Sequence, residues 1–156
     1  MIEKVLLAKA QFNQEGHIMD GQRKSILIVE DDDGNRKLLA LLLEEAGYAA
    51  HHATDGLEAL EEMKRVTFDA VITDRDMPRM NGLELLAQSR ALWPEIPVIL
   101  VSAHAIDARE TVELRGAFAW VQKPYEAPDL LAIVQAAVTA FPHRSWVQSS
   151  TTTISA

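Results

Sequence analysis

The sequence predicts an α/β protein in which a five-stranded parallel sheet carries helices on both faces. Three observations support this fold class. Short apolar runs alternate with helical patterns along most of the chain. Parallel strands need crossover connections of about a dozen residues or more, which helices usually provide. Several of the runs are apolar at consecutive positions, as expected for strands that are buried on both faces. The 156 residues suit one domain of this kind.

The first half of the chain contains three predicted strands and two predicted helices. The strands cover residues 25–29, 48–53 and 68–73. A leucine-rich helical segment over residues 38–45 follows the first strand, and Gly47 stands where such a helix ends. Asp55 is a candidate N-cap for the second helix, in which apolar residues between Leu57 and Met63 share one face.

The second half contains two more strands and three helices. A turn at residues 80–82 leads into a helix that starts at Leu83 and ends before Pro94. The remaining predicted elements are a buried strand over 97–103, a short polar helix over 107–115, a strand over 118–122 and an amphipathic helix over 126–140. Gly116 closes the polar helix, and Pro124 breaks the strand before it.

The two ends of the chain differ in composition from this alternating part. Residues 1–12 have a weak helical pattern, and residues 13–24 have the polar, glycine-containing composition of a linker. The Ser- and Thr-rich residues from 142 onward are typical of a mobile tail. We therefore expect an N-terminal extension over 1–24, one folded domain over 25–141 and a polar tail over 142–156.

Composition argues against several classes of function. The formal net charge of −8 argues against binding to a nucleic-acid backbone, which requires clustered lysine and arginine. The chain has no cysteine, so disulfides, thiolate nucleophiles and cysteine-based metal sites are excluded. Apolar stretches stay well below the ~18–20 residues of a membrane span, and residues 1–12 lack the apolar core of a signal peptide. We expect a cytoplasmic protein that binds neither nucleic acid nor membrane directly.

Polar side chains collect where the predicted strands end. In chain order these residues are Glu30 and Asp31, Asp74 and Asp76, Ser102, and Lys123. The carboxyl ends of parallel strands share one edge of the sheet, and open α/β sheets bind ligands at that edge. Four separate strands therefore direct carboxylates, a hydroxyl and an ammonium toward one place.

The chemistry expected at this edge follows from charge. Converging carboxylates repel each other unless a cation or a proton lies between them. Ligands that are all oxygen suit a hard ion such as Mg²⁺, with Mn²⁺ or Ca²⁺ as substitutes. An anionic phosphoryl group fits beside such a site, because Lys123 would neutralise it and Ser102 would donate a hydrogen bond. The nucleophile would be a carboxylate, since the chain has neither cysteine nor a paired serine and histidine.

Residues 25–140 resemble the response regulator receiver domain, the phosphorylatable module of two-component signalling. The resemblance is carried by four segments in the family's order, ILIVEDD, ITDRDMPRMNGLELL, PVILVSA and VQKP. It implies a five-stranded parallel sheet in the order 2-1-3-4-5, a flavodoxin-like fold. The first 24 residues and the tail after Phe141 lie outside it.

The resemblance implies that Asp74 is the phosphoacceptor. It also implies that Glu30 and Asp31 form the acidic pair, which holds Mg²⁺ together with Asp74 and the backbone carbonyl of Asp76. Many family members have aspartate where this chain has Glu30, whose longer side chain can still reach a metal directly or through water.

Three further roles come from the resemblance. Ser102 is the switch hydroxyl, Lys123 the lysine that pairs with the phosphoryl group, and Trp120 the switch aromatic, where tyrosine or phenylalanine is more usual. The phosphodonor would be a sensor histidine kinase or a phosphotransfer protein. We expect the output surface on the fourth helix, fifth strand and fifth helix, residues 107–140, which would meet a downstream protein and is a candidate homodimer interface.

The competing interpretation is a Mg²⁺-dependent phosphatase of the haloacid dehalogenase type, with Asp74 as nucleophile and Asp76 as acid/base. In that family the acidic pair follows the lysine, whereas here it precedes Lys123. The order of the motifs therefore favours a receiver, which is a signalling phosphoacceptor and not an enzyme.

Simpler explanations exist for several of the polar and aromatic residues. Asp32 and Asp33 fit residues that are solvated or cap the next helix, with Asp33 the expected N-cap, and Asp55 fits the N-cap of a later helix. Trp120 could be a packing residue on an edge strand. His104 fits an exposed position with no role, although it is close enough to Ser102 in sequence to line the mouth of the site.

Overall fold

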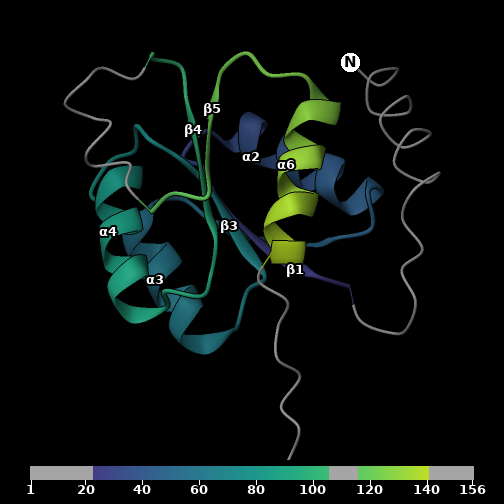
Figure 1. Ribbon diagram of the computed structural model, residues 1–156. Coiled ribbons are helices and arrows are strands. Elements are labelled where there is room, and N and C mark those ends of the chain that lie inside the picture. The colour runs from purple at the N-terminus through teal and green to yellow at the C-terminus, as the bar shows by residue number, and fades with distance from the viewer. Residues whose placement is uncertain (1–22, 106–115, 141–156) are drawn as a thin grey trace, which may run out of the picture.

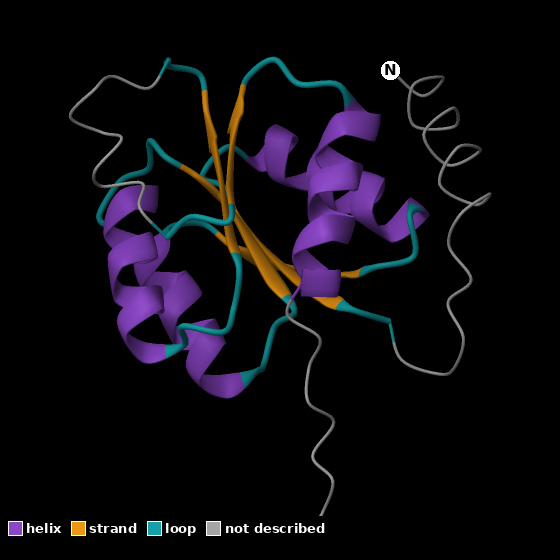
Figure 2. Ribbon diagram, viewed as in Figure 1, coloured by secondary structure: helices purple, strands orange, loops and turns teal. Residues whose placement is uncertain are grey.

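A computed structural model of the protein describes residues 23–105 and 116–140. Its five strands are all parallel and lie in the order β2-β1-β3-β4-β5, which confirms the predicted fold class. Figure 2 shows the strands as a layer between helices. In chain order the elements are β1 (Ser25–Val29), α2 (Asp33–Glu45), β2 (Ala49–Ala53), α3 (Gly56–Arg65), β3 (Ala70–Asp74), α4 (Gly82–Leu92), β4 (Val98–Ser102), β5 (Ala119–Gln122) and α6 (Ala127–Ala140).

Helices cover both faces of the sheet. Figure 1 shows α2 and α6 on one side and α3 and α4 on the other. Successive side chains of a strand point to opposite faces, so β1 supplies both cores. Ile26 and Ile28 pack with the cluster of α2 and α6, whereas Leu27 and Val29 pack with that of α3 and α4. All four are completely buried, which explains why the strand is apolar at every position after Ser25.

Capping residues fix where the helices begin and end. Asp55 is the N-cap of α3, as predicted, and Gly47 follows α2 with a positive φ of 95°. The predicted cap Asp33 is wrong by one residue. Asp32 is the N-cap of α2, because it has the extended backbone that a cap requires, and its carboxylate accepts the N–H of Asn35 at 2.7 Å. Asp33 is the first residue of the helix.

Two elements have boundaries that differ clearly from the predicted ones. Helix α2 begins at Asp33 and not near Leu38, because its first turn is polar and shows no apolar periodicity. Strand β3 extends to Asp74, which therefore ends the strand itself. The predicted helix over 107–115 and the predicted terminal segments fall in residues 1–22, 106–115 and 141–156, outside the described part. Within that described part, the helices are too short or too polar to cross a bilayer.

Candidate functional site

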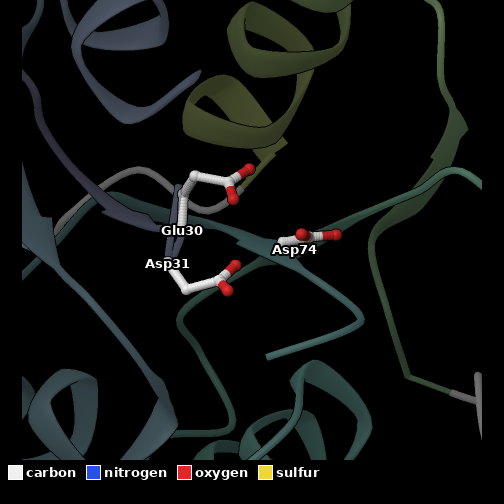
Figure 3. A group of neighbouring side chains, drawn as sticks. All are labelled: Glu30, Asp31 and Asp74. Atoms are coloured by element: carbon white, nitrogen blue, oxygen red, sulfur yellow. The ribbon is translucent and has the colours of Figure 1, made fainter. Parts of the chain in front are cut away.

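Three carboxylates from two neighbouring strands meet at the carboxyl edge of the sheet. Val29 of β1 pairs with Thr73 of β3, so the residues that follow them lie side by side. Glu30, Asp31 and Asp74 each place a carboxylate oxygen within 4.8 Å of the others. Figure 3 shows the three side chains pointing toward one another. The parallel register of β1 and β3 thus creates the acidic group that the sequence predicted.

Burial disfavours the ionised form of two of these carboxylates. Burial raises the pKa of Glu30 above its ordinary value, and the charge of Asp74 adds to the effect, although the Asp32 N–H and Lys123 oppose it. Burial likewise raises the pKa of Asp74, against the lowering influence of Lys123 and of two backbone N–H groups. Both groups therefore gain from an additional positive charge at the site.

Lys123 reaches this acidic group from the end of β5. Its Nζ lies 3.2 Å from Oε2 of Glu30 and 3.6 Å from Oδ2 of Asp74. Burial alone would lower the pKa of the Lys123 ammonium, but the charges of Asp74 and Glu30 raise it above its ordinary value. One ammonium thus faces two partly buried carboxylates, with a third carboxylate, Asp31, beside them.

The residues present fit a hard divalent cation. Glu30, Asp31 and Asp74 offer only oxygen ligands, which Mg²⁺ prefers. Their three negative charges exceed the single charge of Lys123, so a dication would compensate the remainder. Asp31 is exposed, and Mg²⁺ usually keeps several of its water ligands. Asp76 is also exposed and lies two residues beyond β3, with a carboxylate oxygen 3.7 Å from Nε2 of His104.

The loop after Asp74 is fixed by a close approach of two backbone segments. The N–H of Gly82 donates to the carbonyl of Arg75 at 2.9 Å. A Cβ at Gly82 would overlap the carbonyl oxygen of Asp74 and lie 2.9 Å from Cα of Arg75. The sequence predicts only a turn at Gly82, and its place at the end of the DMPRMNG segment is the one sequence signal of this close approach.

Ser102 and Trp120 lie on the neighbouring strands β4 and β5. Ser102 is completely buried, and its Oγ accepts the N–H of His104 at 3.1 Å. Trp120 pairs with Leu100 across the two strands and packs, partly buried, against the core under α3 and α4. These positions are compatible with both the packing and the switch interpretations, so the switch roles stay predictions. His104 is exposed, with 72% of its side-chain surface accessible.

A pocket of about 440 Å³ opens beside the acidic group. Its lining includes Glu30, Asp74 and Lys123 together with Leu38 and Tyr125. The site is therefore reachable from outside, at the point where α2 approaches the chain that follows β5.

The sequence model of the family described as "Response regulator receiver domain" matches residues 26–135. The DNA-binding transcriptional regulator NtrC of Escherichia coli K12 is 34% identical over 121 residues, which are 77% of this chain and 26% of NtrC. Sensory transduction protein RegX3 of Mycobacterium tuberculosis H37Rv is 39% identical over 113 residues, 72% of this chain and 49% of RegX3. The chain thus spans about a quarter to a half of the length of these relatives.

Solved structures give the same result. A CheY-like receiver domain protein from Methanospirillum hungatei aligns with a TM-score of 0.73 and 30% identity, covering 76% of this chain and 96% of that one. Response regulator TrrA from Thermotoga maritima, solved in complex with Mg²⁺ and beryllofluoride, aligns with a TM-score of 0.69 and 32% identity, covering 73% and 98%. These matches favour the receiver interpretation over the haloacid dehalogenase one.

Proposed function

The chain belongs to the response regulator receiver family, and we propose that it accepts a phosphoryl group on Asp74. One observation above all supports the proposal: Glu30, Asp31 and Asp74 converge within 4.8 Å while Lys123 contacts two of them. Asp74 is the carboxylate that has both the acidic pair and the ammonium as neighbours, so it is the one best placed to receive a bound phosphoryl group. We propose a role in signalling and not in enzymatic turnover.

We further propose that Glu30, Asp31, Asp74 and the backbone carbonyl of Asp76 hold Mg²⁺, with Mn²⁺ or Ca²⁺ as substitutes. The ion supplies positive charge that offsets repulsion between the carboxylates and the incoming phosphoryl oxygens. TrrA in complex with Mg²⁺ and beryllofluoride is a family precedent for this chemistry. The oxygen-only donor set of this chain is the supporting observation in the protein itself.

In the proposed step, an ionised carboxylate oxygen of Asp74 attacks the phosphorus atom. A new O–P bond forms while the bond from phosphorus to the donor breaks, and its electron pair stays on the donor's imidazole nitrogen or leaving oxygen. Lys123 stabilises the negative charge on the phosphoryl oxygens, and Ser102 donates a hydrogen bond to one of them. Lys123 therefore neutralises charge, whereas Ser102 responds to phosphorylation.

The partners in this proposal are proteins. A sensor histidine kinase or a phosphotransfer protein supplies the phosphoryl group, and a downstream protein or a second copy meets the surface around Trp120 and α6. NtrC is named a DNA-binding regulator, but the matching region is 26% of its length. The whole chain has a formal net charge of −8, and we propose that residues 25–141 do not themselves bind nucleic acid.

The direct test is incubation of the chain with Mg²⁺ and acetyl phosphate, followed by intact mass spectrometry. We expect a gain of one phosphoryl group, which is lost on treatment with base and retained in acid. Chelation of the divalent ion should prevent the gain. A chain that stays unmodified with Mg²⁺ present would contradict the proposal.

A further inference from the structure

Arg36 holds the backbone of the acidic loop from outside the group of carboxylates. Its Nη1 donates to the main-chain oxygen of Glu30 at 2.8 Å, and its Nη2 donates to Oδ1 of Asp33 at 2.6 Å. Only 14% of its side-chain surface is exposed. We propose that Arg36 is a positioning residue that raises the affinity of the site for a divalent cation by fixing the peptide between Glu30 and Asp31.

The effect of this contact follows from peptide geometry. The carbonyl of Glu30 belongs to a planar unit that also contains the nitrogen and Cα of Asp31. A donor held on that oxygen restrains the whole plane, and with it the direction in which the Asp31 side chain leaves the backbone. The N–H of Glu30 donates to the carbonyl of Ala53 at 3.1 Å, so the preceding peptide is held by the sheet. Both peptides that flank the Cα of Glu30 are therefore fixed.

Arg36 is itself held in place by α2. Its N–H donates to the carbonyl of Asp32 at 2.9 Å, within the first turn of the helix that Asp32 caps. The carboxylate of Asp33 is divided between two cations, with Oδ1 on Arg36 and Oδ2 at 2.6 Å from Nζ of Lys37. The guanidinium is thus oriented by α2 and Asp33, neither of which belongs to the carboxylate group, and such preorganisation lowers the cost of assembling the site.

The proposal rests on the Mg²⁺ site of the proposed function and adds a residue to it. Without a cation, repulsion among Glu30, Asp31 and Asp74 favours conformations in which the loop carries Asp31 away from the others. The hydrogen bond from Arg36 to the Glu30 carbonyl opposes that movement. Losing it should weaken cation binding, whereas merely losing a nearby positive charge should strengthen cation binding. The two effects have opposite sign, so they can be separated.

Lys37 provides a matched control. It carries the same charge one residue further along α2 and pairs with the same carboxylate of Asp33, and Lys37→Met removes that charge while the Arg36–Glu30 bond remains. We would measure the Kd for Mg²⁺ by isothermal titration calorimetry on the full chain, with wild type, Arg36→Met, Arg36→Lys and Lys37→Met. The amide NMR signal of Asp31 would report the loop directly in the absence of metal.

We expect Arg36→Met to raise the Kd for Mg²⁺ about tenfold or more, the range typical of groups that orient metal ligands. Lys37→Met should leave the Kd unchanged or slightly lower. Arg36→Lys keeps the charge and one donor, so its Kd should fall between wild type and Arg36→Met; it also carries the test if Arg36→Met does not fold. The Asp31 amide should shift in the Arg36 variants and stay unchanged in Lys37→Met.

An Arg36→Met chain that binds Mg²⁺ as tightly as wild type, or more tightly, overturns the positioning role and leaves the proposed function intact. Equal weakening by Lys37→Met also overturns it, because that variant keeps the contact with Glu30. A wild-type chain that binds no Mg²⁺ overturns the proposed function and this inference together.

Discussion

Lys123 Nζ lies closer to Glu30 Oε2, at 3.2 Å, than to Asp74 Oδ2, at 3.6 Å. The longer side chain of glutamate makes this contact across the site, and its other oxygen, Oε1, accepts the N–H of Asp32 at 3.1 Å. Lys123 is therefore shared between Glu30 and the proposed phosphoacceptor Asp74. The two carboxylates repel each other, so both depend on the same ammonium for charge balance.

Removing only the ammonium should destabilise the metal-free protein. We expect Lys123→Met to lower the free energy of unfolding by about 1–3 kcal/mol, because Glu30 and Asp74 lose their cation while remaining partly buried. The double variant Lys123→Met/Glu30→Gln should recover part of this loss, since one unpaired charge is gone. Urea unfolding of wild type, Lys123→Met, Glu30→Gln and the double variant measures the coupling between the two side chains. Additive effects of the two substitutions would count against a direct interaction between Lys123 and Glu30.

Asp74→Asn should abolish phosphorylation by acetyl phosphate, because the amide has nearly the same shape but lacks the nucleophilic oxygen. Intact mass after incubation with Mg²⁺ measures the outcome. Asp76→Asn is the matched control. Its side chain is exposed and its backbone carbonyl is unchanged, so it should still become phosphorylated. A base-labile phosphoryl group on Asp74→Asn would show that another residue is the acceptor.

Removing a carboxylate should weaken cation binding but relieve repulsion. We expect Asp31→Asn to raise the Kd for Mg²⁺ at least tenfold, since a ligand counts for at least as much as the groups around it. The metal-free variant should be no less stable than wild type, because one of three converging charges is gone. Calorimetry with Mg²⁺ tests the expected rise in Kd, and urea unfolding without Mg²⁺ tests the expected stability. An unchanged Mg²⁺ titration would contradict the proposed ligand set.

Gly82→Ala should distort the loop that follows Asp74. The new Cβ would overlap the carbonyl of Asp74, and backbone atoms cannot rotate out of the way as a flexible side chain can. We expect a loss of about 1–3 kcal/mol in the free energy of unfolding. Gly34→Ala is the control, because its Cβ would meet only a side-chain oxygen of Asp32 at 3.3 Å. Similar losses of unfolding free energy in both variants would contradict the claim that the overlap with the Asp74 carbonyl causes the destabilisation.

Stability should fall at high pH through Tyr48. Burial raises the pKa of the Tyr48 hydroxyl to about 12, whereas an unfolded chain releases this proton near pH 10. The folded state therefore holds the proton more tightly than the unfolded chain does. The protonated Tyr48 contributes up to about 2–3 kcal/mol to the free energy of unfolding; this contribution is complete below about pH 10 and is lost as the pH rises toward 12. Tyr48→Phe should show a smaller decline in urea unfolding between about pH 9 and pH 11.5, while Tyr125 remains in both proteins. Parallel declines would contradict this assignment.

The sheet and its polar edge were predictable because both depend on local patterns. Consecutive apolar residues at 26–29 identify a strand buried on both faces, and the parallel register then brings the residues after Val29 and Thr73 together. The start of α2 was not predictable in the same way, since the turn from Asp33 has no apolar residue to mark it. Three successive aspartates, Asp31 to Asp33, could each have been the cap, and only the backbone conformation decides among them.

The contacts that tie the site together were also beyond the sequence. Arg36 donates to a main-chain oxygen, and such a bond leaves no pattern of complementary charges in the sequence. The reach of Lys123 to Glu30 spans 93 positions and depends on the lengths of two flexible side chains. Sequence patterns indicate which strand ends meet, whereas the partner of each charge follows from three-dimensional geometry.

Phosphorylation of Asp74 should change the surface through Ser102 and Trp120. The Oγ of Ser102 accepts a hydrogen bond from the His104 N–H, which leaves its own O–H free to donate. A phosphoryl group on Asp74 would attract that hydroxyl and draw the end of β4 inward. Trp120, half-buried on the adjacent strand, could then turn into the vacated space, and a few kcal/mol of differential contact would suffice to shift such an equilibrium.

We would test this switch by NMR with Mg²⁺, with and without beryllofluoride as the phosphoryl mimic. The indole N–H of Trp120, assigned with Trp120→Phe, and the amides of α6 should shift in wild type. In Ser102→Ala these shifts should be much smaller, while those of the loop after Asp74 persist, because the hydroxyl and not the bound anion transmits the change. Tryptophan is larger than the residues usual at this position, and overpacking costs free energy, so the inward state should be incompletely populated. Shifts confined to the loop after Asp74 in the wild-type protein would contradict the switch and leave the phosphoacceptor assignment standing.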